Sequence, residues 1–176
     1  MMTQMSQESQ IGEKILTLDL TGLPGTIQGL QKLHNGRYHL CDGTQDMIDS
    51  LLGEPIMLRS PMTDSVDIIA VSMAELGYPT GGSFEDGCNA SLERGLHLCP
   101  GYFGLLIRDA YDSKGWYFYH LAMKLIAQDG GYSHHFILER DTTPNSRTGK
   151  SLSHSFGLSQ LMGTDQLLFW RPSKTS

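Results

Sequence analysis

A cysteine that follows a glycine-rich stretch offers the clearest potential for chemistry in this sequence. Cys88 ends "GYPTGGSFEDGC" and precedes "NASLERGLHL", which predicts a short helix. A helix N-terminus presents unpaired N–H groups and the positive end of the helix dipole, and both lower the pKa of a thiol. Glycines at 81, 82 and 87 would allow a tight turn and a close approach of the backbone to a substrate. This position therefore predicts a nucleophilic thiolate, whereas the simpler alternative is that Cys88 packs in the core.

A thiolate nucleophile needs a base, and the segment "GGYSHHFILER" offers two. His134 and His135 begin an apolar run that predicts a strand, a rigid platform for an imidazole. Adjacent strand residues point to opposite faces, so at least one of the two is expected to serve only in the core or on the surface. A third polar group should orient the imidazole. His154 is one candidate, and Asp141 and Asn145 are the alternatives.

The elements expected to hold these residues come from periodicity and turn signals. The segment "TDSVDIIAVSMAELGYP" predicts the clearest helix, with an apolar stripe at 66, 69, 70, 73 and 76 and a stop at Gly77 and Pro79. Shorter helices are expected in "TQDMIDSLLG", with Thr44 as its N-cap, and in "LPGTIQGLQKLHNG". Strands are expected in "KILTLDLTG" and "RYHLCDG", and a strand or an extended link in "EPIMLRSP".

Beyond residue 100 the segments rich in aromatic and branched side chains predict an antiparallel sheet: "GYFGLLIRDA", "GWYFYHLAMKLIAQ", "SHHFILER" and "QLLFWRP". Helices followed by a sheet indicate an α+β architecture. We expect residues 1–13 to be a disordered tail and 14–176 a single α+β domain. Within it, 14–63 would be an N-terminal elaboration and 64–176 the core.

Composition restricts the possible functions. The net charge of −6 and the lack of a Lys or Arg run argue against non-specific nucleic-acid binding. No apolar stretch approaches the ~20 residues that span a bilayer, and the polar N-terminus lacks a signal peptide, so we expect synthesis in the cytoplasm without a cleaved signal. The three cysteines form no CxxC pair, which indicates free thiols, and Cys41 and Cys99 are expected to pack. The scattered histidines predict no metal site. We also expect no cofactor.

Part of the chain resembles the NlpC-type cell-wall cysteine peptidases, which are small papain-like enzymes. The shared order is a predicted helix, "LGYPTGG", a cysteine at a helix start, and Ser133-His134 at the head of a strand 46 residues after Cys88. "SLSHS" would supply the family's third polar residue, with His154 several residues later than the family spacing. The chain departs from the family at Gly87, where an Asp is usual, and at Asn89-Ala90, where Ser-Gly is usual.

The resemblance implies a papain-like α+β fold and hydrolysis of amide bonds in peptidoglycan stem peptides. Cys88 would attack the carbonyl, His134 would act as base and acid, and His154 would hold the imidazole. The chain also looks like amidase toxins that type VI secretion exports, which implies a cognate immunity protein as a partner. Papain-like effector proteases and glutamine deamidases use the same Cys–His logic and stay open as alternatives.

A second resemblance, to the Src-homology-2 domains that bind phosphotyrosine peptides, makes the opposite demands. Arg108 in "GLLIRDA" matches the family's strand arginine, which grips phosphate bidentately, and His135 matches its strand histidine. "SFGLSQLM" would be the family's second helix. The hydrolase requires Cys88 exposed near His134, whereas the binding module requires Arg108 exposed near His135.

Overall fold

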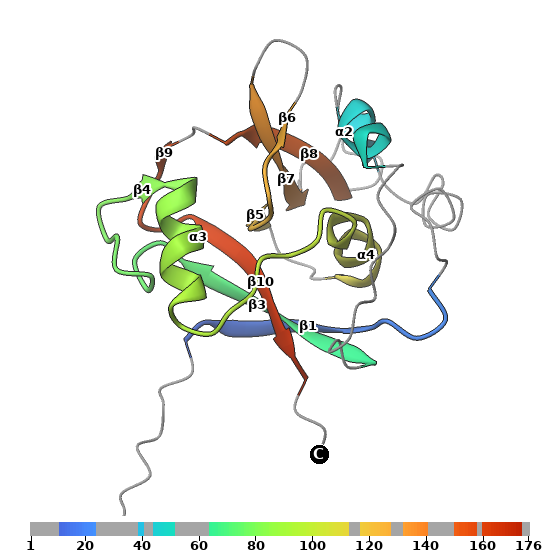
Figure 1. The fold of residues 1–176 in the computed structure, drawn as a ribbon, viewed down its shortest axis with the longest axis horizontal. Helices are drawn as coiled ribbons and strands as arrows, with labels where there is room; N and C mark the ends of the chain where they lie inside the picture. The colour runs from blue at the N-terminus through green and yellow to red at the C-terminus, as the bar shows by residue number, and fades with distance from the viewer. Residues whose placement is uncertain are drawn as a thin grey trace, which may run out of the picture.

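The computed structural model of the protein describes residues 11–23, 39–40, 44–51, 64–112, 117–127, 132–140, 150–157 and 160–173. Three helices in these ranges pack on a large, mostly antiparallel sheet (Figure 1). The helices are α2 (Thr44–Ser50), α3 (Phe84–Leu92) and α4 (Phe103–Ala110). None of the described helices is long and apolar enough to cross a membrane.

The large sheet draws its strands from both ends of the chain. Its spatial order is β1 (Glu13–Asp19), β3 (Ser65–Ser72), β10 (Gln166–Pro172), β5 (Tyr117–Leu121), β7 (Ser133–Arg140), β8 (Lys150–Phe156) and β2 (His39–Leu40). The short β6 (Ile126–Ala127) also pairs with β7, and β4 (Gly82–Ser83) and β9 (Gln160–Leu161) form a separate two-stranded sheet. The pairs β10–β5 and β2–β8 are parallel, and the other ladders are antiparallel.

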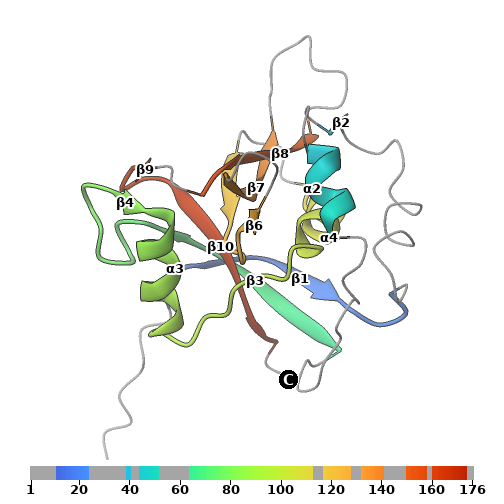
Figure 2. The same ribbon diagram turned by 45° about the horizontal axis from the view of Figure 1, so that its top comes forward.

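The sheet buries both of its faces, which carry two separate apolar clusters. Alternation along β3 and β10 places Ile69, Val71, Leu167 and Phe169 on one face, under α3; we call this the α3 face. The residues between them in sequence point to the other face, under α2 and α4, which we call the α4 face. Val66, Ile68, Leu168, Phe136 and Leu138 belong to its cluster. In Figure 2, β3 and β10 pass between α3 on one side and α2 and α4 on the other.

Several predicted elements are confirmed. The strands expected in "KILTLDLTG", "SHHFILER" and "QLLFWRP" are β1, β7 and β10, and β2 lies within "RYHLCDG". The helix expected after Thr44 is α2, and the segment "GWYFYHLAMKLIAQ" contains β5 and β6. The α+β class is therefore confirmed.

Two predicted elements are wrong. The segment expected to be the clearest helix contains β3, a central strand whose residues Val66 to Val71 are all buried. The segment "GYFGLLIRDA", expected to be a strand, forms α4. Because β1 and β3 enter the main sheet, the expected separation into N-terminal helices and a C-terminal sheet is also wrong.

The structure describes the N-terminal segment from Ile11 onward. Ile11 packs, partly buried, against the cluster of the α3 face, and β1 begins at Glu13, the last residue of the predicted tail. Residues outside the described ranges include the predicted helix in "LPGTIQGLQKLHNG" after Leu23, the segment "EPIMLRSP", Cys41, Asp141 and Asn145.

Candidate functional site

The helix that carries Cys88 begins four residues before it. Ser83 caps α3: its Oγ accepts a hydrogen bond from the Asp86 N–H at 3.0 Å, and Asp86 Oδ2 accepts one from the Ser83 N–H at 2.9 Å. This reciprocal pair is a capping box. Cys88 is consequently the fifth helical residue, beyond the first turn where the dipole and the unpaired N–H groups act. The expectation that Cys88 starts the helix is wrong.

The Cys88 thiol is buried and its pKa moves in the direction opposite to that of a nucleophile. The residue is 6% exposed within the cluster of the α3 face. Burial, followed by the negative charge of Glu85, raises the pKa of the Cys88 thiol to about 12. Cys99 is also buried, as expected, and its Sγ lies 3.5 Å from the carbonyl oxygen of Leu168.

The glycines before Cys88 serve chain packing. A Cβ on Gly87 would lie 2.8 Å from Met73 Sδ, and one on Gly82 would lie 3.1 Å from Tyr78 Cδ1. Gly81 has φ +96°, and a Cβ there would collide with the carbonyl oxygen of Leu161 in β9. These three positions are thus occupied by the protein's own chain, which accounts for the glycines without a substrate.

His135 lies on the α3 face and contacts the rings of His120 and Phe84. Its Nε2 is 2.8 Å from His120 Nδ1, and Phe84 of α3 stacks on its ring with a centroid distance of 4.0 Å. Burial, with the neighbouring His120 next in effect, lowers the pKa of His135 to about 3, so the ring is neutral at pH 7. Its Nδ1 is buried and finds no hydrogen-bond partner among the described residues.

His134 and His154 meet on the α4 face. In the β7–β8 register His154 is opposite Phe136, so its side chain shares a face with Phe136 and His134. The two imidazole centroids are 5.0 Å apart, and Thr44 Oγ1 of α2 lies 3.3 Å from His154 Nδ1. Burial, followed by the charge of His154, lowers the pKa of His134.

The predicted Cys88–His134–His154 constellation is not assembled. The structure brings His134 and His154 together, but Cys88 belongs to α3 and its cluster, on the opposite face of the sheet. Of the two predicted bases, His135 is the one on the Cys88 face. Its exposed fraction is 0%, and Phe84 covers its ring.

Arg108 does not present its guanidinium as a phosphate-binding strand arginine would. It lies in the last turn of α4 and is fully buried. Its two terminal nitrogens each donate at 3.3 Å, one to the carbonyl oxygen of Glu139 and the other to that of Tyr111. Its guanidinium carbon is 5.5 Å from the centroid of the Tyr117 ring. The expected placement of Arg108 on an exposed strand is wrong, and the residue instead ties the end of α4 to β7.

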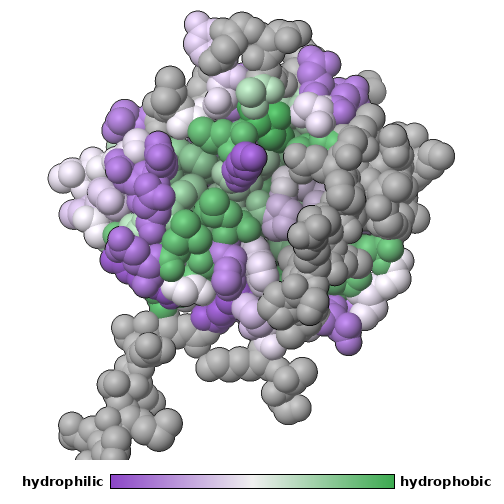
Figure 3. All heavy atoms as spheres, in the orientation of Figure 1, coloured by the Kyte–Doolittle hydropathy of each residue, from purple (hydrophilic) through white to green (hydrophobic). Residues whose placement is uncertain are grey.

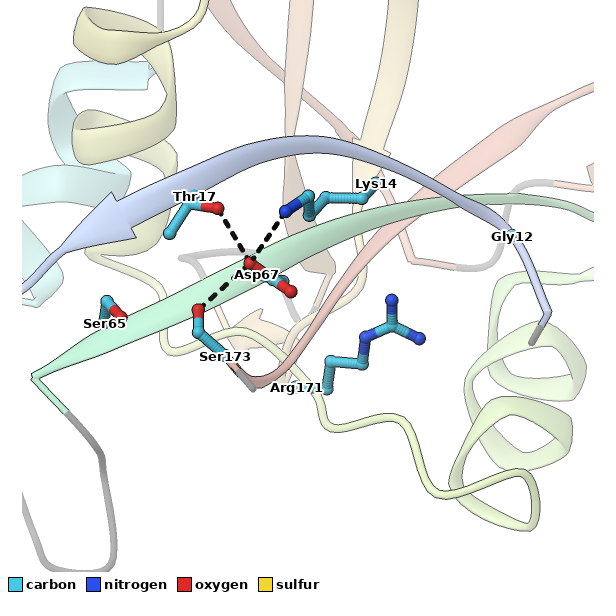
Figure 4. A pocket seen from close by; sticks show the side chains of 7 residues that line it. All are labelled: Gly12, Lys14, Thr17, Ser65, Asp67, Arg171 and Ser173. Atoms are coloured by element: carbon cyan, nitrogen blue, oxygen red, sulfur yellow. Dashed lines mark hydrogen bonds and ion pairs between the residues drawn. The ribbon is translucent and has the colours of Figure 1, made fainter. Parts of the chain in front are cut away.

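A polar pocket that sequence reasoning missed lies where β1, β3 and β10 run side by side (Figure 4). Its volume is about 700 Å³. Asp67 points to the α3 face, because it alternates with Ile69 and Val71 along β3. Thr17 and Arg171 share this face, because each is opposite Asp67 in the register of its strand with β3. The lining residues are Gly12, Lys14, Thr17, Ser65, Asp67, Arg171 and Ser173.

Asp67 is the centre of this pocket. The residue is 7% exposed, and its Oδ1 accepts hydrogen bonds from Thr17 Oγ1 at 2.8 Å and Ser173 Oγ at 3.0 Å. Lys14 Nζ lies 3.7 Å from the same oxygen. Burial by itself would raise the pKa of Asp67, but the two hydroxyls and the charges of Lys14 and Arg171 together hold it below the usual value. Asp67 is therefore ionised at neutral pH.

The pocket depends on a close approach at its rim. Gly12 has φ +75°, and a Cβ there would lie 2.6 Å from Val71 Cγ2 and 2.7 Å from the carbonyl oxygen of Ala70. One sequence signal could have indicated the site. Asp67 is the single charged residue within the apolar run "SVDIIAVS", and a buried charge in a strand requires partners.

Comparisons with known proteins leave the identity open. No family model, no curated protein and no solved structure matches the chain. The papain-like fold, the peptidoglycan substrate, the type VI export and the immunity partner stay predictions. Among the residues that the structure describes, no group of three His, Cys, Asp or Glu side chains is arranged to hold a metal ion.

Proposed function

We propose that the protein is a binding domain for a small anionic molecule, held in the pocket around Asp67. The observation that carries this proposal is the almost buried Asp67 carboxylate between two cationic side chains, Lys14 and Arg171, in a pocket of about 700 Å³. That volume is in the range of about 300–1,000 Å³ typical of small-molecule sites.

The balance of charge favours an anion. Among the lining residues that the structure describes, Lys14 and Arg171 are positively charged and Asp67 is negatively charged, in a chain whose net charge is −6. The Lys14 side chain is 53% exposed, so its ammonium can turn from Asp67 towards a bound group. A guanidinium such as that of Arg171 matches carboxylates and phosphates through two parallel hydrogen bonds.

Thiol chemistry has less support than binding. The cysteine hydrolase needs a reactive Cys88, but burial raises the pKa of this thiol and the sheet separates it from His134. The phosphotyrosine module needs an accessible Arg108, which is fully buried. The pocket, in contrast, presents its charged groups at a concave surface.

A titration with inorganic phosphate, followed by amide chemical shifts in solution, tests the proposal. We expect the largest shifts at residues 12–17, 65–67 and 171–173, and at least a tenfold loss of affinity in Arg171→Gln. Lys124→Gln is the matched control, because it removes one positive charge from an exposed side chain that does not line the pocket. Shifts elsewhere only, or equal losses in the two variants, would refute the proposal.

A further inference from the structure

A pair of buried histidines lies beneath α3, and neither of them lines the pocket around Asp67. His120 of β5 and His135 of β7 are 5% and 0% exposed, and the distance of 2.8 Å between His120 Nδ1 and His135 Nε2 is that of a hydrogen bond. One of these nitrogens must donate and the other accept, which two neutral rings can do. On the other side of its ring, His135 Nδ1 is buried and has no hydrogen-bond partner among the described residues.

An added proton would have no favourable place in this pair. An imidazolium carries N–H donors on both nitrogens, so a protonated His135 would hold a buried N–H at Nδ1 without an acceptor among the described residues. If His120 were protonated as well, two N–H groups would face each other across 2.8 Å. Phe84 stacks on the His135 ring at a centroid distance of 4.0 Å and offers no acceptor. Protonation therefore requires that water reach His135.

The charged groups around the pair do not offset this cost. Burial is the largest effect on both rings and lowers both pKa values, that of His135 to about 3. The carboxylate of Asp165 has the opposite effect, but it acts on His120, whereas His134 and His154 lower the pKa of His135 further. The titratable side chains next to the pair on the elements packed against it are His134 in β7, His154 in β8, Asp165 before β10, and Glu85 and Cys88 in α3.

α3 is the element that can move away from the pair. It begins at Phe84, and no hydrogen bond between described residues joins it to the large sheet. Its contacts are made by side chains of the apolar cluster on the α3 face, among them Phe84 and Cys88. β4, which precedes α3, forms a short ladder with β9 rather than with the large sheet. In contrast, α4 is tied to β7 by the hydrogen bond from Arg108 to the Glu139 carbonyl oxygen. Loss of the stack between Phe84 and His135 therefore weakens the attachment of α3 and leaves that of α4 intact.

We propose that the His120–His135 pair is an acid-sensitive switch that holds α3 on the sheet at neutral pH and releases it in acid. While both rings are neutral, Phe84 stacks on His135 and α3 covers the apolar cluster of its face. When the pair takes up a proton, water must reach His135, which is fixed in the sheet, so Phe84 moves away together with α3. The apolar cluster and Cys88 then become exposed while α4 stays in place. Because the fold lowers the pKa of both rings, their stabilisation of α3 is complete above about pH 6.5 and is lost as the pH falls.

Amide hydrogen exchange of the full chain at pH 6.5 and pH 5.0, read by mass spectrometry of peptides, tests this proposal. Rates are divided by those of the urea-unfolded chain at the same pH to give protection factors. Ordinary carboxylates stay largely ionised over this interval, so histidines dominate the change. If the open state takes up one proton with a pKa of about 6.5, the protection of Phe84–Leu92 should fall about 16-fold. At pH 5.0 we expect α4 to remain at least tenfold better protected than α3.

Two variants identify the sensor. His135→Leu removes the titrating ring and should reduce the fall in α3 protection to threefold or less. His97→Gln is the matched control, because it removes an exposed imidazole outside the pair and should keep the full fall.

Three outcomes would overturn the switch. Equal protection of α3 and α4 at both pH values would mean that the two helices open only together. A fall of less than threefold in the unaltered protein would mean that the opening of α3 takes up no proton. A full fall in a folded His135→Leu variant would mean that another group senses the pH. The comparison of α3 with α4 uses the unaltered protein and requires no variant to fold.

Discussion

The Cys88 thiol should be almost inert in the folded protein. With a pKa of about 12, the thiolate fraction at pH 8 is about 10⁻⁴. A thiol with the ordinary pKa of about 8.5 is about one-quarter ionised at that pH. Since iodoacetamide reacts with the thiolate, we expect alkylation of Cys88 to be about 10³-fold slower in the native protein than in denaturant. Peptide mass spectrometry of timed samples gives both rates.

The same experiment contains its control and its refutation. Cys99 is buried as deeply and should be at least as slow, so the ratio of the two rates compares Cys88 with a thiol for which no chemistry is predicted. Burial of the thiol by α3 predicts that labelling accelerates only when the helix opens, in parallel with unfolding by urea. Labelling of native Cys88 at a rate within tenfold of the unfolded rate would contradict a buried, protonated thiol and would support a nucleophilic role for Cys88.

Two further predictions concern stability. The folded-state pKa of His135, about 3, is below the unfolded value of about 6.5, so its neutral form stabilises the fold above pH 6.5, and this stability is lost as the pH falls from 6.5 towards 3. We expect the urea midpoint to fall steadily over this window and His135→Leu to show a shallower fall; an unchanged slope would contradict the assignment. In α4, Arg108→Ala should cost about 3–5 kcal/mol, because it leaves a cavity as well as two carbonyls without donors. Arg108→Met keeps most of the side-chain volume and should cost about 1–2 kcal/mol in urea unfolding, and equal losses would refute the packing role.

The strand β3 shows why periodicity alone failed in the core. Val66, Ile69, Ala70 and Met73 match one face of a helix, but every position from Val66 to Val71 is buried because the strand is covered on both faces. A strand covered on both faces loses the alternation that identifies a strand. The β-branched content of "SVDIIAVS" was the better signal. In β1, where apolar and polar residues alternate in sequence, the prediction of a strand was right.

The candidate site was predictable only in part for a related reason. Opposite orientations of His134 and His135 follow from the strand, but which face α3 would cover depends on tertiary packing. The start of α3 was readable, since Ser83 and Asp86 have the spacing of a capping box. The Asp67 pocket joins residues from three strands that are distant in sequence, so the lone charge in "SVDIIAVS" could mark Asp67 but no local pattern could show which residues surround it.

The most exposed apolar side chains of the described residues do not line the Asp67 pocket. Among the described residues they are Leu92, Tyr132 and Met162, in α3, next to β7 and after β9. In Figure 3 apolar side chains (green) also gather near the centre of the view, bordered by hydrophilic ones (purple). The charged pocket and these apolar surfaces are thus chemically distinct parts of the molecule.

The position of β10 makes the sheet depend on a strand that is synthesised late. β1 and β3 form one half of the sheet, β5, β7, β8 and β2 form the other, and β10 supplies the ladder to both. While the ribosome is still translating residues 166–172, the edges of β3 and β5 that later receive β10 have no strand between them. Such edges can pair with other chains, so aggregation should compete with folding of this protein until β10 is synthesised and has paired with β3 and β5.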